Sequence, residues 1–297
     1  MSSKLVFLLS LCLTAPLLRA ADFKPNLGPD VPTIAVTCED VSLVLRRSSQ
    51  WTPARFDFRD EPMSTERSAY GTVFLFPEIG FIGTNHLENE PEELQSLSFI
   101  VDGEPIGNPG PELTGKTFRF LRDSRIRDFR LQNEWEIRND RIYETVTITS
   151  AKDVPLKLVY PFMHAWKPSV SAYLAGSDPN PELSESGELH DGESIARKFF
   201  INAPVDWLAV YEPESGQFAV SRLLTFPEET SHSSKIWNVP GAYRKQYLTV
   251  FANQTVPKGF SGTWKMVTGF GQATSAEWKE KATTLAGLLL KDSESKL

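Results

Sequence analysis

Cysteine is scarce in this chain. Only two occur among the 297 residues, and Cys12 lies inside the N-terminal apolar run. If that run is removed, Cys38 remains alone and no intrachain disulfide can form. Neither the cysteines nor the four scattered histidines have the spacing of a zinc site. We therefore expect a fold that is stabilised by its own core, which a chain of about 275 residues is long enough to bury.

Basic clusters and phosphate-binding loops are also missing. The chain has 31 Lys and Arg against 38 Asp and Glu, which gives a net charge of -7. Such a balance argues against nucleic acid and anionic membranes as partners. There is no Gly-rich phosphate loop, no internal repeat and no sign of a metal or an organic cofactor. The acidic stretch Glu88–Glu93 has the oxygen ligands that calcium accepts, and its other interpretation is a solvated turn.

The N-terminus has the three parts of a secretory signal peptide. Lys4 supplies the positive charge, Leu5–Leu18 form a short apolar run, and Leu18-Arg19-Ala20 offers a cleavage site with a small residue. A membrane anchor is the alternative, but a spanning helix needs about 20 apolar residues. We predict that residues 1–20 are removed, that the net charge becomes -9 through loss of Lys4 and Arg19, that no membrane span remains and that the protein is periplasmic or secreted.

From Thr33 to Phe270 the hydrophobic pattern alternates with period two, and Gly, Pro, Asn and Asp interrupt it. Asn139-Asp140 lies between two alternating segments and predicts a hairpin. Numerous strands without interleaved helices predict an all-β antiparallel sandwich or barrel over residues 21–272. Other expected strands are Val41–Arg46, Leu97–Val101, Thr117–Leu121, Pro155–Trp166, Trp207–Tyr211, Gln217–Arg222, Tyr243–Phe251 and Thr263–Phe270. The polar stretch from Asp178 to Gly192 is expected to be a long surface loop.

One helix is expected, within residues 273–297. Thr274 and Glu277 have the spacing of a capping box. An apolar stripe follows at helical spacing, and a charged tail begins at Lys291. Its members are Trp278, Ala282, Leu285, Ala286 and Leu289.

Several polar residues stand in apolar or turn-rich surroundings and are candidates for a site. Arg55 and Asp57 alternate with Phe56 and Phe58, so they share a face that is either solvated or able to bind hydroxyls or a carboxylate. Asn85-His86 follows two glycines in a turn, where the imidazole is either polar surface or part of a binding rim.

A second group of candidates lies in strands. Alternation places Tyr160, His164 and Trp166 on one face, where a histidine is either a hydrogen-bonded core residue or part of a sugar site. Glu144 stands among β-branched residues, and there it either pairs with a cation or acts as an acid or base with a raised pKa. Glu212 and Trp237 add an acid and an indole.

In its order of features the mature chain resembles the galactose mutarotase-like (aldose 1-epimerase-like) superfamily. The similar segments are Trp51–Asp57, Gly83–His86, Tyr160–His164 and Pro257–Met266. The resemblance implies a β-supersandwich with a carbohydrate groove. His164 would then be the general acid, and His86 and Arg55 would bind the sugar.

The chain departs from that superfamily at the general base. Its glutamate normally stands shortly before the final strand, but residues 235–247 contain no Asp or Glu. Loss of a proton-transfer group costs about 10²–10⁴ in rate, unless Glu212 or Glu144 substitutes. We therefore expect a carbohydrate-binding protein without standard epimerase activity. The alternatives are an epimerase with a relocated base, or a structural or partner-binding sandwich. The oligomeric state is left open.

Overall fold

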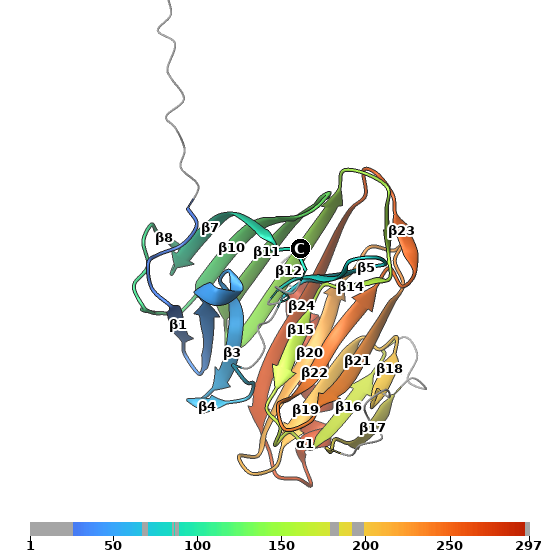
Figure 1. Ribbon diagram of the computed structural model, residues 1–297. Coiled ribbons are helices and arrows are strands. Elements are labelled where there is room, and N and C mark those ends of the chain that lie inside the picture. Colours follow the sequence, from blue (N-terminus) through green and yellow to red (C-terminus); the bar gives the residue numbers. More distant parts are fainter. Residues whose placement is uncertain are drawn as a thin grey trace, which may run out of the picture.

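Ten strands form the central sheet of the protein, for which a computed structural model describes residues 26–66, 71–84, 86, 89–178, 184–191 and 199–294 (Figure 1). The predicted signal peptide and Asn85 lie outside the described residues. The order across the sheet is β17-β16-β19-β20-β24-β12-β11-β10-β7-β8. The bounds are β7 Glu93–Val101, β8 Glu104–Ile106, β10 Phe118–Ile126, β11 Phe129–Arg138, β12 Arg141–Ser150, β16 Ala172–Gly176, β17 Glu185–Glu188, β19 Trp207–Glu212, β20 Gln217–Thr225 and β24 Ser261–Gln272.

Two smaller sheets and a two-stranded ribbon are built from the rest of the strands. The N-terminal five-stranded sheet has the order β4-β3-β2-β1-β9, and the seven-stranded sheet has the order β18-β21-β22-β14-β5-β6, with β15 paired to β22. The five strands are β1 Thr33–Cys38, β2 Val41–Arg46, β3 Thr52–Phe58, β4 Glu61–Pro62 and β9 Glu112–Gly115, and a 3-10 turn, Arg47–Ser49, links β2 to β3. The seven are β5 Val73–Phe76, β6 Gly80–Gly83, β14 Leu158–Tyr160, β15 Met163–Trp166, β18 Ile201–Ala203, β21 His232–Val239 and β22 Tyr243–Val250. A short ribbon pairs β13 Val154–Leu156 with β23 Gln254–Val256.

Both smaller sheets pack on the same face of the central sheet. Strands β1–β3 share one hydrophobic core with β10, β11 and β12, and strands β5, β14 and β22 share a second core with β11, β12 and β24. Period-two alternation explains this arrangement, because it turns every second side chain of β11 and β12 inward. Asn139 and Asp140 join these two strands with φ values of 52° and 53°, as a tight hairpin turn requires.

The C-terminal helix α1, Trp278–Glu294, covers the opposite face of the central sheet (Figure 1). The Oγ1 of Thr274 donates to Glu277 at 3.0 Å, and the Trp278 amide donates to the Thr274 carbonyl at 3.0 Å, so the predicted start of the helix is confirmed. The apolar stripe packs on β19, β20 and β24. None of the helices in the described residues has the length and apolar character needed to span a membrane.

Two predicted segments differ from the structure. Pro155–Trp166 is not one strand but three short strands, β13, β14 and β15. Val159 pairs with Val250 but Met163 pairs with Tyr247, so the register on β22 shifts by one residue in between. Such a shift turns the later residues to the other face. The predicted loop from Asp178 to Gly192 contains the edge strand β17, paired to β16.

Candidate functional site

His164 lies in the interior, where strands from all three large sheets meet. It stands on β15 opposite Gln246 of β22 and is only 1% exposed. Its Nε2 atom lies 2.6 Å from the Oε1 atom of Glu144 on β12, and Glu144 is 3% exposed. The indole N–H of Trp135 donates to the second oxygen of this carboxylate at 3.2 Å. The structure thus joins two of the predicted catalytic residues in one buried pair.

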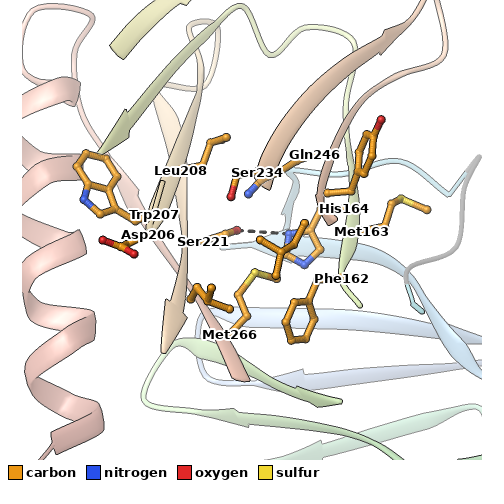
Figure 2. Close-up of a pocket in the computed structure, with 13 residues that line it drawn as sticks. Phe162, Met163, His164, Asp206, Trp207, Leu208, Ser221, Ser234, Gln246 and Met266 are labelled. Carbon is orange, nitrogen blue, oxygen red and sulfur yellow. Dashed lines mark hydrogen bonds between the residues drawn. The ribbon is translucent and has the colours of Figure 1, made fainter. Parts of the chain in front are cut away.

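Polar and aromatic groups surround this pair on its other sides. The Nδ1 atom of His164 lies 3.4 Å from the hydroxyl of Ser221 (Figure 2). The Ser221 hydroxyl lies 3.0 Å from the hydroxyl of Thr268. The rings of Phe56 and Trp166 meet the imidazole edge-on, with centroids 5.3 and 5.2 Å away. Trp166 itself donates to Gln246 at 2.7 Å, so it faces the core.

The cavity beside His164 is small. It has a volume of about 20 Å³ and is lined by side chains of β15, β19, β20, β22 and β24, including Ser221, Gln246 and Met266 (Figure 2). A space of about 10–15 Å³ is enough for one water molecule, whereas pockets for organic ligands measure about 300–1,000 Å³. A sugar ring therefore does not fit between His164 and its neighbours in this conformation. The carboxylate and the imidazole contact each other and do not flank a substrate.

Arg55 and Asp57 lie on the opposite face of β3 from Phe56, as predicted. The Arg55 guanidinium contacts Asp57 at 2.9 Å and Glu66 at 2.8 Å. Burial raises the pKa of Asp57, and the neighbouring charge of Arg55 acts in the other direction. Because Phe56 points towards His164, the Arg55–Asp57 pair points away from it. The structure does not bring these two candidates to the buried histidine.

Glu212 is the last residue of β19, and its carboxylate binds the turn that follows. Its carboxylate accepts hydrogen bonds from the amide and the hydroxyl of Ser215, at 2.7 and 2.6 Å, and Lys167 lies 3.5 Å away. Burial alone would raise the pKa of Glu212, but the Ser215 hydrogen bonds and the Lys167 charge outweigh it and lower the pKa. These contacts keep Glu212 ionised and fully engaged at the turn. It is not placed to act with His164.

His86 and Trp237 belong to a continuous series of rings on the outer face of the seven-stranded sheet, which we call the ring ladder. Successive rings are in contact from β6 to β21. The centroid distances are 4.9 Å for His86–Phe81, 6.1 Å for Phe81–Tyr160, 5.3 Å for Tyr160–Tyr247, 6.3 Å for Tyr247–Phe199 and 5.4 Å for Phe199–Trp237. Tyr160 is buried, and the other five residues are half-buried.

The register shift before β15 explains why Tyr160 and His164 do not share the predicted face. Tyr160 turns outward, and its hydroxyl lies 3.2 Å from the Nε2 atom of His86. His164 and Trp166 turn inward. The prediction of one common face was wrong, because alternation was continued through Pro161, where the strand is interrupted.

Two lysines lie among the rings of the ladder. Lys245 donates to the Tyr160 hydroxyl at 3.4 Å, and its ammonium lies 4.7 Å from the Tyr160 ring centroid and 5.1 Å from that of Tyr247. Lys235 lies 5.6 Å from the Phe199 centroid. Burial lowers the pKa of Lys245 to about 8 and also lowers the pKa of Lys235. The cation–π contacts hold both ammonium groups over the rings.

The sequence analysis missed these lysines, although it singled out the stretch that contains them. Residues 235–247 attracted notice because they lack an acid. The same alternation that was used for other strands places Lys235 and Trp237 of β21 on one face with Lys245 and Tyr247 of β22. Phe81 and Phe199 could not be added from the sequence, since they come from distant parts of the chain.

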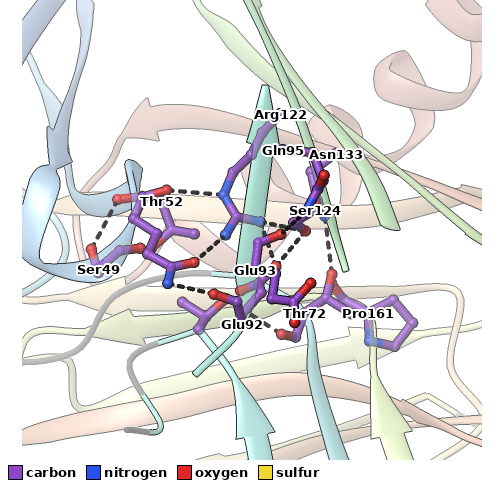
Figure 3. A network of polar contacts seen from close by, with 12 residues as sticks. Ser49, Thr52, Thr72, Glu92, Glu93, Gln95, Arg122, Ser124, Asn133 and Pro161 are labelled. Carbon is purple, nitrogen blue, oxygen red and sulfur yellow. Dashed lines mark hydrogen bonds and ion pairs between the residues drawn. The ribbon is translucent and has the colours of Figure 1, made fainter. Parts of the chain in front are cut away.

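A second buried polar network lies between the N-terminal and central sheets (Figure 3). Arg122 of β10 contacts Glu92 at 2.7 Å and donates to the Gln50 carbonyl at 2.9 Å, and the Ser124 hydroxyl donates to Glu92 at 2.5 Å. Glu92 comes from the acidic stretch that was considered for calcium, and it is held here by a guanidinium. Within the described ranges, no group of three or more His, Cys, Asp or Glu is arranged to hold a metal ion.

Comparisons with solved structures agree with the architecture. The galactosidase domain of the α-galactosidase–sucrose kinase AgaSK matches with a TM-score of 0.52 at 8% identity, over 82% of this chain and 41% of that one. A Synechocystis sp. PCC 6803 protein matches with a TM-score of 0.50 at 10% identity, over 84% of this chain and 100% of that one. A galactose mutarotase-like protein from Clostridium acetobutylicum matches with a TM-score of 0.46 at 9% identity, over 80% and 94%.

The two matches with TM-scores of 0.50 and 0.52, together with the antiparallel sheets, confirm the predicted fold class, an all-β antiparallel sandwich with one C-terminal helix. At identities of 8–10% the likeness shows the fold alone. No protein-family model and no curated protein sequence matches the chain.

Proposed function

We propose that this chain is an exported carbohydrate-binding protein that holds a saccharide on its ring ladder and does not catalyse anomer exchange at His164. The observation that supports this proposal is the ring ladder. Five half-buried rings around the buried Tyr160 form a largely apolar platform, and hydroxyl, imidazole and ammonium groups lie beside them. Sugars have the same two features, because their C–H faces pack on aromatic rings and their hydroxyls need hydrogen-bond partners.

The fold and the interior support the same proposal. Solved structures of this fold include proteins named as galactosidases. The cavity of about 20 Å³ beside His164 accepts no sugar ring, and the imidazole is held against Glu144. An acid and a base in mutual contact cannot act on two sides of a substrate. We therefore assign His164 and Glu144 to the stability of the core.

Binding is tested by isothermal titration calorimetry with a panel of oligosaccharides. Trp237→Ala and Tyr247→Ala should each weaken binding of any ligand found by about tenfold, which corresponds to about 1.4 kcal/mol. Phe226→Ala is the matched control, because Phe226 is an exposed aromatic residue outside the ladder. Unchanged affinity in both ladder variants, or no ligand in the panel, would remove the basis of the proposal.

Catalysis is tested separately by polarimetry on freshly dissolved aldoses. The protein should not accelerate anomer exchange. Acceleration that disappears in His164→Gln would instead support an epimerase.

Export is part of the proposal and has its own test. Expressed in a bacterial host with its leader, the protein should be recovered outside the cytoplasm, and N-terminal sequencing should begin at Ala21 or Asp22. Recovery from the cytoplasm with residues 1–20 intact would contradict it.

A further inference from the structure

The two lysines of the ring ladder differ from many other cations of this protein. Arg122, Arg244 and Lys167, for example, each meet a carboxylate. Lys245 and Lys235 make no ion pair with any carboxylate in the described part of the chain, and burial is what lowers the pKa of both. In a chain with more acids than bases, two neighbouring ammonium groups of this kind are unexpected.

Strand register places the two lysines close together. Lys235 of β21 lies directly opposite Tyr247 of β22, and Trp237 lies directly opposite Lys245. The two lysines are therefore diagonal neighbours on one face, and diagonal Cα atoms lie about 7–8 Å apart. Lys235 donates towards β18 and Lys245 towards β14, so the two ammonium groups lie apart on this face, and a carboxylate or sulfate at either one would form a charge-assisted hydrogen bond.

The hydrogen bonds of the two lysines fix the positions of their ammonium groups. Lys235 donates to Asn202 at 2.7 Å and to Thr249 at 2.9 Å, and Lys245 donates to Tyr160 at 3.4 Å. These partners are neutral oxygen atoms, so they hold the ammonium groups in position without neutralising them. The rings between the lysines offer the apolar surface on which a sugar ring packs.

We propose that the ring ladder binds an anionic saccharide, a sugar that bears a carboxylate or a sulfate, with its anionic group held by the ammonium groups of Lys245 and Lys235. This inference rests on the proposed function and adds the chemical class of its ligand. Among the described residues, the titratable groups that face the lysines are the hydroxyls of Tyr160 and Tyr247 and, beyond Tyr160, the imidazole of His86. Burial raises the pKa of Tyr247, so its hydroxyl stays neutral and brings no competing negative charge.

The test is calorimetric titration of the full mature chain at pH 7 with matched ligand pairs. Trigalacturonate is compared with its methyl ester, and galactose 6-sulfate with galactose. We expect the anionic member of at least one pair to bind about tenfold or more tightly, as charge-assisted hydrogen bonds allow. A preference for the uronate would identify the carboxylate as the anionic group, and a preference for the sulfate ester would identify the sulfate; either supports the proposal.

Variants distinguish the contribution of the two lysines to affinity from that of the aromatic rings. Lys245→Met and Lys235→Met should each remove most of the preference for the anionic ligand and leave binding of the neutral ligand intact, which also shows that the variants fold. Lys245→Arg should keep the preference. Lys265→Met is the matched control, because Lys265 is an exposed strand lysine of β24 outside the ladder.

Different results would overturn the anionic ligand and the proposed carbohydrate binding. Equal affinity for both members of each pair, with binding still lost in Trp237→Ala, overturns the anionic ligand and keeps the proposed function. A preference that persists in the Lys245→Met and Lys235→Met double variant also overturns the inference. Absence of binding to all four ligands and to the neutral panel overturns both.

Discussion

Replacing Glu144 by alanine tests the structural role that we assign to the buried pair. Glu144 lies 2.6 Å from His164 and also accepts the indole N–H of Trp135, and both members of the pair are at most 3% exposed. The substitution leaves two buried polar groups without their partner. A buried polar group left without its hydrogen-bond partner costs about 1–3 kcal/mol, so Glu144→Ala, which leaves two such groups, should lower the free energy of unfolding by about 2–6 kcal/mol.

Urea denaturation followed by tryptophan fluorescence measures this loss, with the m-value expected to stay unchanged. The matched control is Glu134→Ala on the neighbouring strand, where an exposed ion pair with Arg119 at 2.6 Å is lost. An exposed pair contributes about 0–1 kcal/mol. The double change Glu144→Leu with His164→Phe should recover part of the loss, because the imidazole that needs a partner is gone while the Trp135 N–H still lacks its acceptor. If Glu144→Ala costs no more than Glu134→Ala, the assignment of this pair to core stability is refuted.

Burial raises the pKa of the Cys38 thiol to about 12, so a thiol reagent at pH 8 should modify the unfolded chain and leave the native one intact; rapid native modification would contradict this. Gly83→Ala should destabilise the protein by about 2 kcal/mol or more, since Gly83 has φ +122° and an added Cβ would lie 2.4 Å from the Thr72 carbonyl oxygen, whereas Gly107→Ala should be neutral. Binding of trigalacturonate should weaken as pH rises through about 8, where Lys245 loses its proton, and a flat profile from pH 7 to 9 would count against that lysine.

Much of the fold was accessible from the sequence, because a half-buried strand leaves a local signal. Val41–Arg46 has the predicted bounds, and Asn139-Asp140 forms the predicted hairpin turn. The capping-box pair Thr274 and Glu277 marked the start of the helix. These features depend on neighbours within a few residues, so no knowledge of the distant chain was needed.

The candidate site depended on contacts that the sequence does not carry. Alternation placed Glu144 on an inward face correctly, but nothing local indicated His164 as its partner, 20 residues away. The one-residue register shift at Pro161 separated Tyr160 from His164 and reversed the face of every later residue. Individual residues were thus assigned to plausible roles, while their grouping required the structure.

The sequence also does not show which aromatic residues lie on a half-buried outer face and which lie in the core. Trp166 and Trp237 each precede a polar residue, Lys167 and Asn238, yet Trp166 donates to Gln246 in the core and Trp237 contacts Phe199 on the outer face. Which face of a strand is covered depends on the packing of whole sheets. The sequence therefore indicated an aromatic site without locating it.

The indole N–H signals in a two-dimensional NMR spectrum report where a saccharide binds. If it binds on the ring ladder, titration with an oligosaccharide ligand should shift the Trp237 signal. It should leave the signals of Trp135 and Trp166 unchanged, because their N–H groups donate to Glu144 and Gln246 inside the core. Shifts of Trp135 and Trp166 with an unchanged Trp237 would place the ligand at His164 and contradict the account.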